Sequence, residues 1–172
     1  LAKEAGFPDG VFNVITGSAG EIGKELTSNP IVRKISFTGS TEVGKILLEQ
    51  SASTVKKVSM ELGGHAPFIV FDDADMDEAV AGALQSKFRN SGQTCICSNR
   101  IFVHENIYDE FLEKFTNEVS KITVGNGLED GITSGPLIDQ SSLEKVVDHV
   151  QDAVNTGAKI AIGGDVHSLG GN

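Results

Sequence analysis

The sequence predicts an α/β protein built on a parallel sheet, and two observations support this. Up to residue 62, segments rich in β-branched and aromatic residues alternate with segments of helical periodicity. The order there is strand, helix, strand, helix, strand, which is typical of parallel strands joined by crossover helices. After residue 64, an apolar strand and several amphipathic helices follow.

The first half of the chain contains three expected strands and two expected helices, after a helical end that Gly6 caps. Turn residues separate them. Pro30, for example, keeps Asn29 out of helical geometry and so ends the first helix. The expected strands are residues 11–16, 33–38 and 56–62, and the expected helices are residues 21–27 and 41–51.

The second half follows Gly63-Gly64, the predicted boundary between domains at residues 1–63 and 64–172. Its first strand is an uninterrupted apolar run, of the kind buried on both faces of a sheet. Ser141 and Glu144 are expected to cap the last helix, which Gly157 ends. The expected strands are residues 66–71, 100–104 and 159–162, and the expected helices are residues 76–88, 106–121 and 141–156.

Composition and charge narrow the possible partners. Hydrophobic residues make up 39% and charged residues 22%, as in soluble globular proteins. The formal charge of −10 argues against binding to nucleic acid or anionic membranes. Two cysteines do not make a disulfide scaffold, so we expect a reducing compartment, the cytoplasm or alternatively the mitochondrial matrix. The chain opens as if in mid-helix, and we expect it to be part of a longer polypeptide.

The polar stretch after the helix at 76–88 holds both cysteines, Cys95 and Cys97. Because Gly92 interrupts the helix, Cys95 can keep access to solvent, and nearby cations or N–H groups would favour its nucleophilic thiolate. The alternative is a small buried residue without a chemical role. A metal site formed with His65 and His104 is not expected, because the Cys-x-Cys step differs from the usual Cys-x-x-Cys spacing.

The loop at 37–44 joins an expected strand to an expected helix. Its backbone N–H groups and the positive end of the helix would suit a phosphate or pyrophosphate. Gly39 would allow the ligand to approach, and Gly44 would let the helix pack against the sheet. The pattern is not Gly-x-Gly-x-x-Gly, and an ordinary strand–helix turn is the alternative.

Two charged residues are further candidates. Glu61 lies at the apolar end of its strand, where partial desolvation would suit a general base. It could instead be a solvated glutamate at the sheet edge. Arg89 precedes Cys95 by six residues and could hold a substrate carboxylate through two hydrogen bonds. Its alternative role is to complement the helix dipole.

Three stretches taken together resemble the aldehyde dehydrogenase superfamily. They are Phe37–Gly44 (Phe-Thr-Gly-Ser-Thr-Glu-Val-Gly), Met60–Gly64 (Met-Glu-Leu-Gly-Gly) and Gly92–Cys95 (Gly-Gln-Thr-Cys). Residues 66–71 and 88–97 are similar to the succinate-semialdehyde dehydrogenase branch. The resemblance covers essentially the whole chain. It implies the C-terminal half of a Rossmann-like cofactor domain at 1–63 and the N-terminal part of the catalytic domain at 64–172.

The resemblance implies oxidation of an aldehyde, succinate semialdehyde above all, with NAD or NADP. Cys95 would attack the carbonyl carbon, its backbone N–H would help to hold the oxyanion, and Glu61 would activate the water that hydrolyses the thioester. Arg89 would bind the distal carboxylate, and Cys97 would be a redox partner of Cys95. The residues implied to lie against the cofactor are Gly39, Ser40, Thr41, Gly44 and Leu62.

The family resemblance also implies a homo-oligomer as the intact enzyme, with a small aldehyde as its partner. From the negative charge we expect no nucleic acid or membrane as a partner. A Cys95–Cys97 disulfide would close a small strained ring and be easily reduced. Two other functions stay open. One is a non-catalytic nucleotide-binding or assembly fragment, and the other is a thiol redox sensor.

Overall fold

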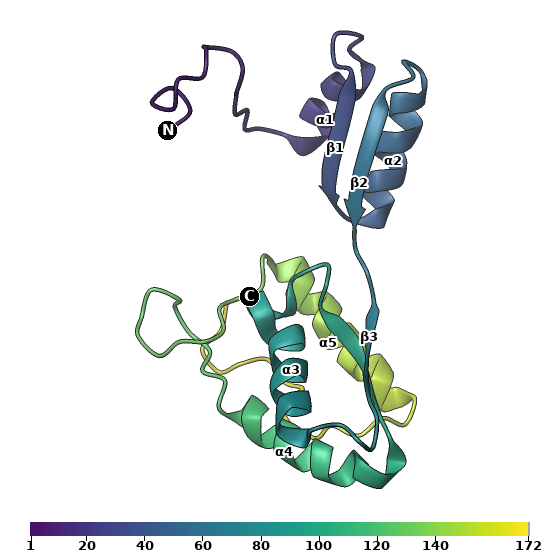
Figure 1. The fold of residues 1–172 in the computed structure, drawn as a ribbon, viewed down its shortest axis with the longest axis vertical. Coiled ribbons are helices and arrows are strands. Elements are labelled where there is room, and N and C mark those ends of the chain that lie inside the picture. Colours follow the sequence, from purple (N-terminus) through teal and green to yellow (C-terminus); the bar gives the residue numbers. More distant parts are fainter. Residues whose placement is uncertain (172) are drawn as a thin grey trace. The chain divides into compact units, whose positions relative to one another are not determined.

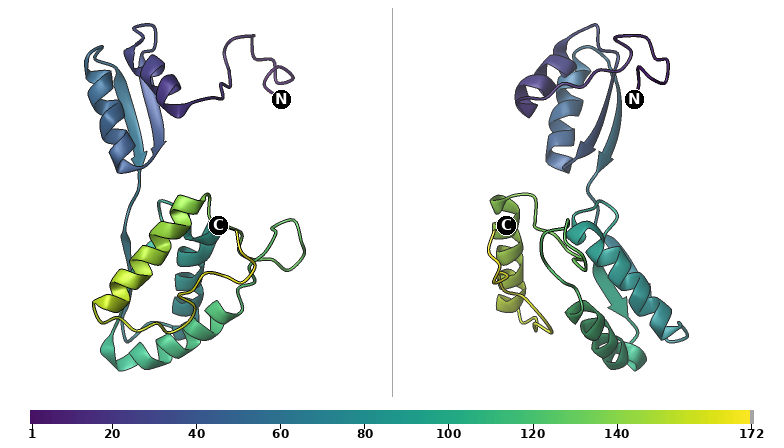
Figure 2. Two further views of the ribbon diagram at one scale, coloured as in Figure 1. Left: turned by 180° about the vertical axis from the view of Figure 1, so that it is seen from behind. Right: turned by 90° about the vertical axis from the view of Figure 1, so that its left-hand side faces the viewer.

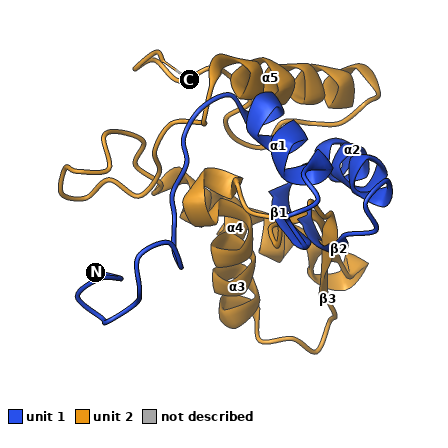
Figure 3. Ribbon diagram, turned by 90° about the horizontal axis from the view of Figure 1, so that it is seen from above, with its two compact units in different colours: residues 1–62 blue, residues 63–172 orange. Residues whose placement is uncertain are grey.

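The computed structural model describes residues 1–171 and has the helices and strands shown in Figure 1, with further views in Figure 2. The chain divides into two compact units, residues 1–62 (unit 1) and the residues from Gly63 onward (unit 2), coloured separately in Figure 3. The division falls one residue before the predicted boundary. Each unit contains a pair of parallel strands, so the predicted α/β class with parallel strands is confirmed.

Unit 1 consists of one parallel strand pair with two helices on one face (Figure 2). The strands run in register from Lys34 opposite Lys57 to Gly39 opposite Leu62. The elements are α1 (Ala19–Ser28), β1 (Lys34–Gly39), α2 (Thr41–Ala52) and β2 (Lys57–Leu62).

Hydrogen bonds from polar side chains stabilise unit 1 near the C-terminal end of α1. The buried hydroxyl of Thr27 donates to the carbonyl of Gly23 at 2.8 Å. The ammonium of Lys56 donates to the carbonyls of Asn29 at 2.6 Å and Val32 at 2.8 Å. A cation at a helix C-terminus satisfies carbonyls that have no partner within the helix and complements the dipole. Lys56 therefore fixes the turn between α1 and β1.

Unit 2 begins with a strand–helix–strand crossover, and its remaining helices follow (Figure 1). A short 3₁₀ turn, η1, follows α3, and a second, η2, precedes α4. The elements are β3 (Ala66–Val70), α3 (Met76–Phe88), η1 (Arg89–Gly92), β4 (Ser98–Val103), η2 (Glu105–Ile107), α4 (Tyr108–Ser120) and α5 (Gln140–Asn155).

The core of unit 2 lies where α3 and α4 pack on the β3–β4 pair. Its buried centre is Val70, Val80, Ala83 and Phe111. Phe115 stacks on Phe111 with ring centroids 5.5 Å apart. By contrast, no residue of α5 is buried. The β3–α3–β4–α4 layer, which holds the buried core, is therefore the part that can position a site rigidly.

Two expected strands are not formed within the described part of the chain. Residues 11–16 and 159–162 belong to no strand, and the apolar side chains of the first segment are exposed, Phe12 by 70% and Val14 by 76%. A strand needs a neighbour to take its hydrogen bonds, and local composition cannot supply one. The prediction of five elements up to residue 62 is therefore wrong for the first strand.

Two local predictions for unit 2 are also wrong. β3 is covered on one face only, because Val70 is buried while Ile69 is 58% exposed. The cap of α5 is Asp139 rather than Ser141, because its carboxylate reaches the backbone N–H of Ser142 at 2.8 Å. Hydrogen bonds from the side chain and backbone of Ser142, and then from Ser141, lower the pKa of Asp139 below its ordinary value.

Candidate active site

The turn between β1 and α2 is the first predicted part of the site. Ser40 caps α2, and its hydroxyl accepts a hydrogen bond from the backbone N–H of Val43 at 3.2 Å. A Cβ at Gly39 would lie 2.3 Å from the ring of Phe37, and one at Gly44 would lie 2.7 Å from Leu62. Both glycines therefore permit close packing within unit 1, and the positive end of the α2 dipole would favour an anion beside this turn.

An apolar hollow of about 500 Å³ lies in unit 1 among α1, β1 and α2. The first helix lines it with Ile22 and Leu26, and α2 lines it with Val43 and Leu47. In size and lining it fits a flat ring system next to an anion-binding helix start, as in a nucleotide. Sequence reasoning missed this hollow, although the four-residue spacing of each pair is a signal that could have indicated it.

Glu61 lies on β2 opposite Thr38. Its side chain is exposed in the described structure, so the partial desolvation expected from the sequence is not found. Among residues 1–171, the strand pairs with β1 alone. Glu61 belongs to unit 1, whereas Cys95 and Arg89 belong to unit 2.

Three consecutive residues before Cys95 have left-handed backbone geometry. The φ values are 52° at Asn90, 55° at Ser91 and 77° at Gly92. Only the glycine adopts this region without cost, and each of the other two is strained by about 1–3 kcal/mol. This turn ends α3 sharply and directs the chain toward β4, with Cys95 between them.

The two cysteines differ in environment. Cys95 is exposed, whereas Cys97 is only 1% exposed, and both are free thiols. The sulfur of Cys97 lies 2.6 Å from the hydroxyl of Thr94 and 3.6 Å from the carbonyl oxygen of Lys87. A Cβ at Gly64 would lie 3.1 Å from the carbonyl oxygen of Cys95. The predicted nucleophile is therefore accessible, and its neighbour is packed under the loop.

Arg89 lies beside the loop that carries the predicted nucleophile, although Cys95 itself does not line the hollow that they share. A hollow of about 300 Å³ is lined by Arg89 together with Thr94 and Ile96, the two residues that flank Cys95. Arg89 is exposed and has no side-chain hydrogen bond or ion pair to another residue in the range 1–171. Its guanidinium can therefore hold an anion that enters this hollow.

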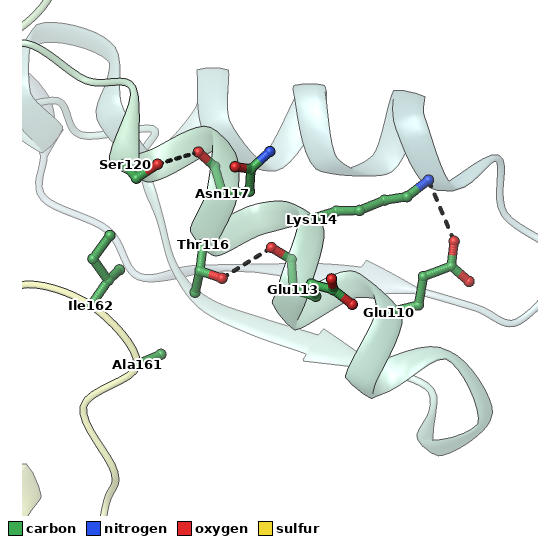
Figure 4. Close-up of a pocket in the computed structure, with 8 residues that line it drawn as sticks. All are labelled: Glu110, Glu113, Lys114, Thr116, Asn117, Ser120, Ala161 and Ile162. Carbon is green, nitrogen blue, oxygen red and sulfur yellow. Dashed lines mark hydrogen bonds and ion pairs between the residues drawn. The ribbon is translucent and has the colours of Figure 1, made fainter.

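A larger hollow, of about 570 Å³, runs along α4 (Figure 4). It contains none of the predicted site residues. Its lysine, Lys114, pairs with Asp77 at 2.7 Å and with Glu110 at 3.4 Å, and chiefly the hydrogen bond to Asp77 raises the pKa of Lys114. The charge of Lys114 is thus already matched by two carboxylates.

Between Leu1 and Gly171, no group of three His, Cys, Asp or Glu side chains is arranged to hold a metal ion. None of the described helices combines the length and the apolar character needed to span a bilayer.

Comparison with known proteins identifies relatives of the entire chain. A model of the aldehyde dehydrogenase family matches residues 1–172. The chain is 61% identical over 172 residues to succinate-semialdehyde dehydrogenase [NADP(+)] GabD of Escherichia coli strain K12, covering 100% of this chain and 36% of that protein. It is 61% identical over 171 residues to glutarate-semialdehyde dehydrogenase of Pseudomonas aeruginosa, covering 99% and 35%.

Among solved structures, the crystal structure of an E. coli NADP-dependent enzyme matches with a TM-score of 0.97 and 60% identity. The match covers 99% of this chain and 36% of that one. The chain thus spans about a third of the length of the relatives it matches.

Proposed function

The chain belongs to the aldehyde dehydrogenase family, and we propose that it carries the nucleophile of an NAD(P)-dependent enzyme that oxidises an acidic aldehyde, succinate semialdehyde above all. One observation carries this proposal. The exposed thiol of Cys95 lies in a loop whose flanking residues share a hollow with the unpaired guanidinium of Arg89.

Cys95 has the chemical role in the proposal. Its thiolate adds to the aldehyde carbon and gives a thiohemiacetal, and loss of hydride from that carbon gives a thioester. The backbone N–H of Cys95 stabilises the negative charge on the substrate oxygen. Exposure of the thiol supports this role, because an aldehyde must reach it.

Glu61 is proposed to activate the water that releases the carboxylate product from the thioester. Its place at the end of β2, two residues before the Gly63-Gly64 junction, supports the assignment. Over the whole reaction one aldehyde, one water and one oxidised cofactor give one carboxylate, one reduced cofactor and two protons.

The proposed cofactor is NAD or NADP, which supplies the hydride acceptor. Gly39, Ser40, Thr41 and Gly44 would hold its phosphates at the start of α2, and Leu62 would lie toward its reactive end. The capped helix start and the apolar hollow beside it support this assignment. The E. coli relative is named as an NADP(+)-dependent enzyme.

Arg89 sets the proposed substrate class. Succinate semialdehyde and glutarate semialdehyde, the substrates in the names of two relatives, each carry a carboxylate at the end opposite the aldehyde. A guanidinium binds such a group through two parallel hydrogen bonds. The absence of a competing carboxylate on Arg89 within the described structure supports this role.

Cys97 is proposed as a redox partner that silences Cys95 by forming a disulfide with it when a peroxide takes up the two electrons and two protons and is reduced to water. It would first have to leave its contact with Thr94, because the thiol is buried under the loop.

We also propose that the intact enzyme is a homo-oligomer in the cytoplasm or mitochondrial matrix. The family resemblance and the low cysteine content support this setting.

Replacement of Cys95 tests the proposed function. In the intact enzyme, Cys95→Ala should abolish NAD(P)-dependent oxidation of succinate semialdehyde, while Cys97→Ala, two residues away, should keep it. Bound cofactor should slow alkylation of Cys95, measured by mass spectrometry of its peptide. Undiminished oxidation by Cys95→Ala would refute the proposal. Loss of activity to peroxide that is equal in wild type and Cys97→Ala would refute the redox role.

A further inference from the structure

We infer that Ser91 and Gln93 are positioning residues for the nucleophile, because their side chains fasten the loop that carries Cys95 to the segment 134–138. The inference rests on the proposed function of Cys95. It adds a role for two side chains that take no chemical step, and every contact that carries it lies within unit 2.

The hydroxyl of Ser91 is fully used in this attachment. It donates to the carbonyl oxygen of Gly135 at 3.1 Å and accepts from the N–H of the same residue at 3.2 Å. It also lies 3.0 Å from the hydroxyl of Ser134. One donor and two acceptor positions are the complete capacity of a hydroxyl, so Ser91 holds this segment at a defined distance.

The side-chain amide of Gln93 makes the second attachment and uses both ends. Its oxygen accepts from the N–H of Ile138 at 2.9 Å, and its nitrogen donates to the carbonyl of Pro136 at 3.3 Å. A side chain that pairs with both a backbone donor and a backbone acceptor fixes position as well as distance.

The segment that receives these bonds is itself held at both ends. Gly125 donates to the carbonyl of Ser134 at 3.0 Å, and Ser134 donates to the carbonyl of Thr123 at 3.1 Å. At its other end, Asp139 caps α5 immediately after Ile138. The segment is therefore tied both to the chain that leaves α4 and to the start of α5.

The loop is anchored on the far side of Cys95 as well. Cys97 and Ser98 are buried, and the hydroxyl of Ser86 on α3 donates to that of Ser98 at 2.9 Å. Cys95 is thus an exposed residue between two anchors, followed by Ile96, which is 67% exposed. The first anchor also holds Asn90 and Ser91 in left-handed geometry, which persists only where surrounding contacts impose it.

Removal of the first anchor, the bonds from Ser91 and Gln93 to residues 134–138, should allow the loop to relax. The thiol would then move away from the geometry for attack. Because displacement of about 1 Å costs a reacting group up to about 100-fold in rate, we expect a fall in kcat of about tenfold or more. Arg89 directly follows α3, and Gly82, Gln85 and Ser86 of α3 form the other wall of its hollow. Because α3 packs in the core, KM for the acidic aldehyde should change less than kcat.

The test compares Ser91→Ala and Gln93→Met with two matched controls in the intact enzyme. The controls are Ser120→Ala at the end of α4 and Gln151→Met on α5, whose side chains bond only within their own helices. Three quantities are measured for each: kcat and KM with succinate semialdehyde, the rate of Cys95 alkylation by iodoacetamide as a function of pH, and Tm.

The inference predicts a lower kcat, a near-constant KM and an altered alkylation profile for the two loop variants only. Wild-type kcat and alkylation in Ser91→Ala and Gln93→Met would overturn it, whatever happens to Tm. If both fail to fold, Ser134→Ala, which removes a single contact, decides: an intermediate kcat supports the inference and an unchanged kcat overturns it.

The same measurements separate this inference from the proposed function. Inactive wild type, or an active Cys95→Ala, would count against the proposed function. An active wild type with inactive Cys95→Ala and fully active Ser91→Ala and Gln93→Met would refute the positioning role alone.

Discussion

The sequence predicts a role for Arg89 from its side-chain chemistry, but not where its side chain lies relative to Cys95. Its distance of six residues from Cys95 suggested a substrate contact, yet a helix-end arginine more often lies free in solvent. The structure adds that Arg89 shares a hollow with the neighbours of Cys95. That shared hollow depends on the left-handed turn at 90–92, which the residue types Asn and Ser permit but do not require.

The residue-scale prediction concerns substrate charge. Arg89→Ala in the intact enzyme should raise KM for succinate semialdehyde by about 10-fold or more, because a charge-assisted hydrogen bond contributes about 1.5–3 kcal/mol. The kcat should change little. Steady-state kinetics with an uncharged aldehyde of similar length is the control, and its KM should stay near the wild-type value. Equal losses for both aldehydes would remove Arg89 from carboxylate binding.

The glycines of unit 1 show how a helix is fitted to its strand. Gly44 is on α2 facing Leu62 of β2, and the space for a Cβ there is only 2.7 Å. Gly20 is also helical, on α1, but a Cβ there would meet nothing within 4 Å. Substitution of Gly20 by alanine therefore tests helix propensity alone, whereas the same substitution at Gly44 also tests packing against Leu62.

The element-scale prediction uses this pair. Gly20→Ala should raise the free energy of unfolding by about 0.5–1 kcal/mol, because alanine favours the helix. Gly44→Ala should lower it by about 1 kcal/mol or more, because α2 must move away from Leu62. Denaturant unfolding measures both. A gain in stability from Gly44→Ala would show that the Leu62 side chain yields without moving the helix.

At the scale of the whole chain, local patterns predicted the elements that have a partner within the sequence. β1 pairs with β2, and β3 with β4, and all four were expected. The segment 11–16 has the same strand composition but pairs with nothing in the described residues. Periodicity reports which face of a segment is apolar, whereas pairing depends on what lies beside it. The same reasoning explains why Ile69 on β3 is exposed although its strand reads as fully buried.

In the candidate site, too, the sequence predicts local features but not contacts between residues that are far apart along the chain. Short motifs placed Cys95, Glu61 and the start of α2 correctly in a loop, at a strand end and at a helix start. The attachment of Ser91 and Gln93 to residues 134–138 spans more than 40 positions, and no spacing rule reports it. The hollow in unit 1 likewise joins three elements.

The exposed apolar side chains give the last prediction, which concerns the 172-residue chain by itself. Phe12, Val14, Phe71 and Leu128 are all more than 60% exposed, and no residue of α5 is buried. The chain also spans about a third of the length of its relatives. Apolar surface of this extent usually marks an interface. The isolated chain should therefore bind the dye ANS and form ill-defined aggregates in sedimentation experiments. The same residues within a chain of the relatives' length should bind no dye and should sediment as one defined oligomer. A monomeric, dye-free 172-residue chain would show that these side chains tolerate water without a partner.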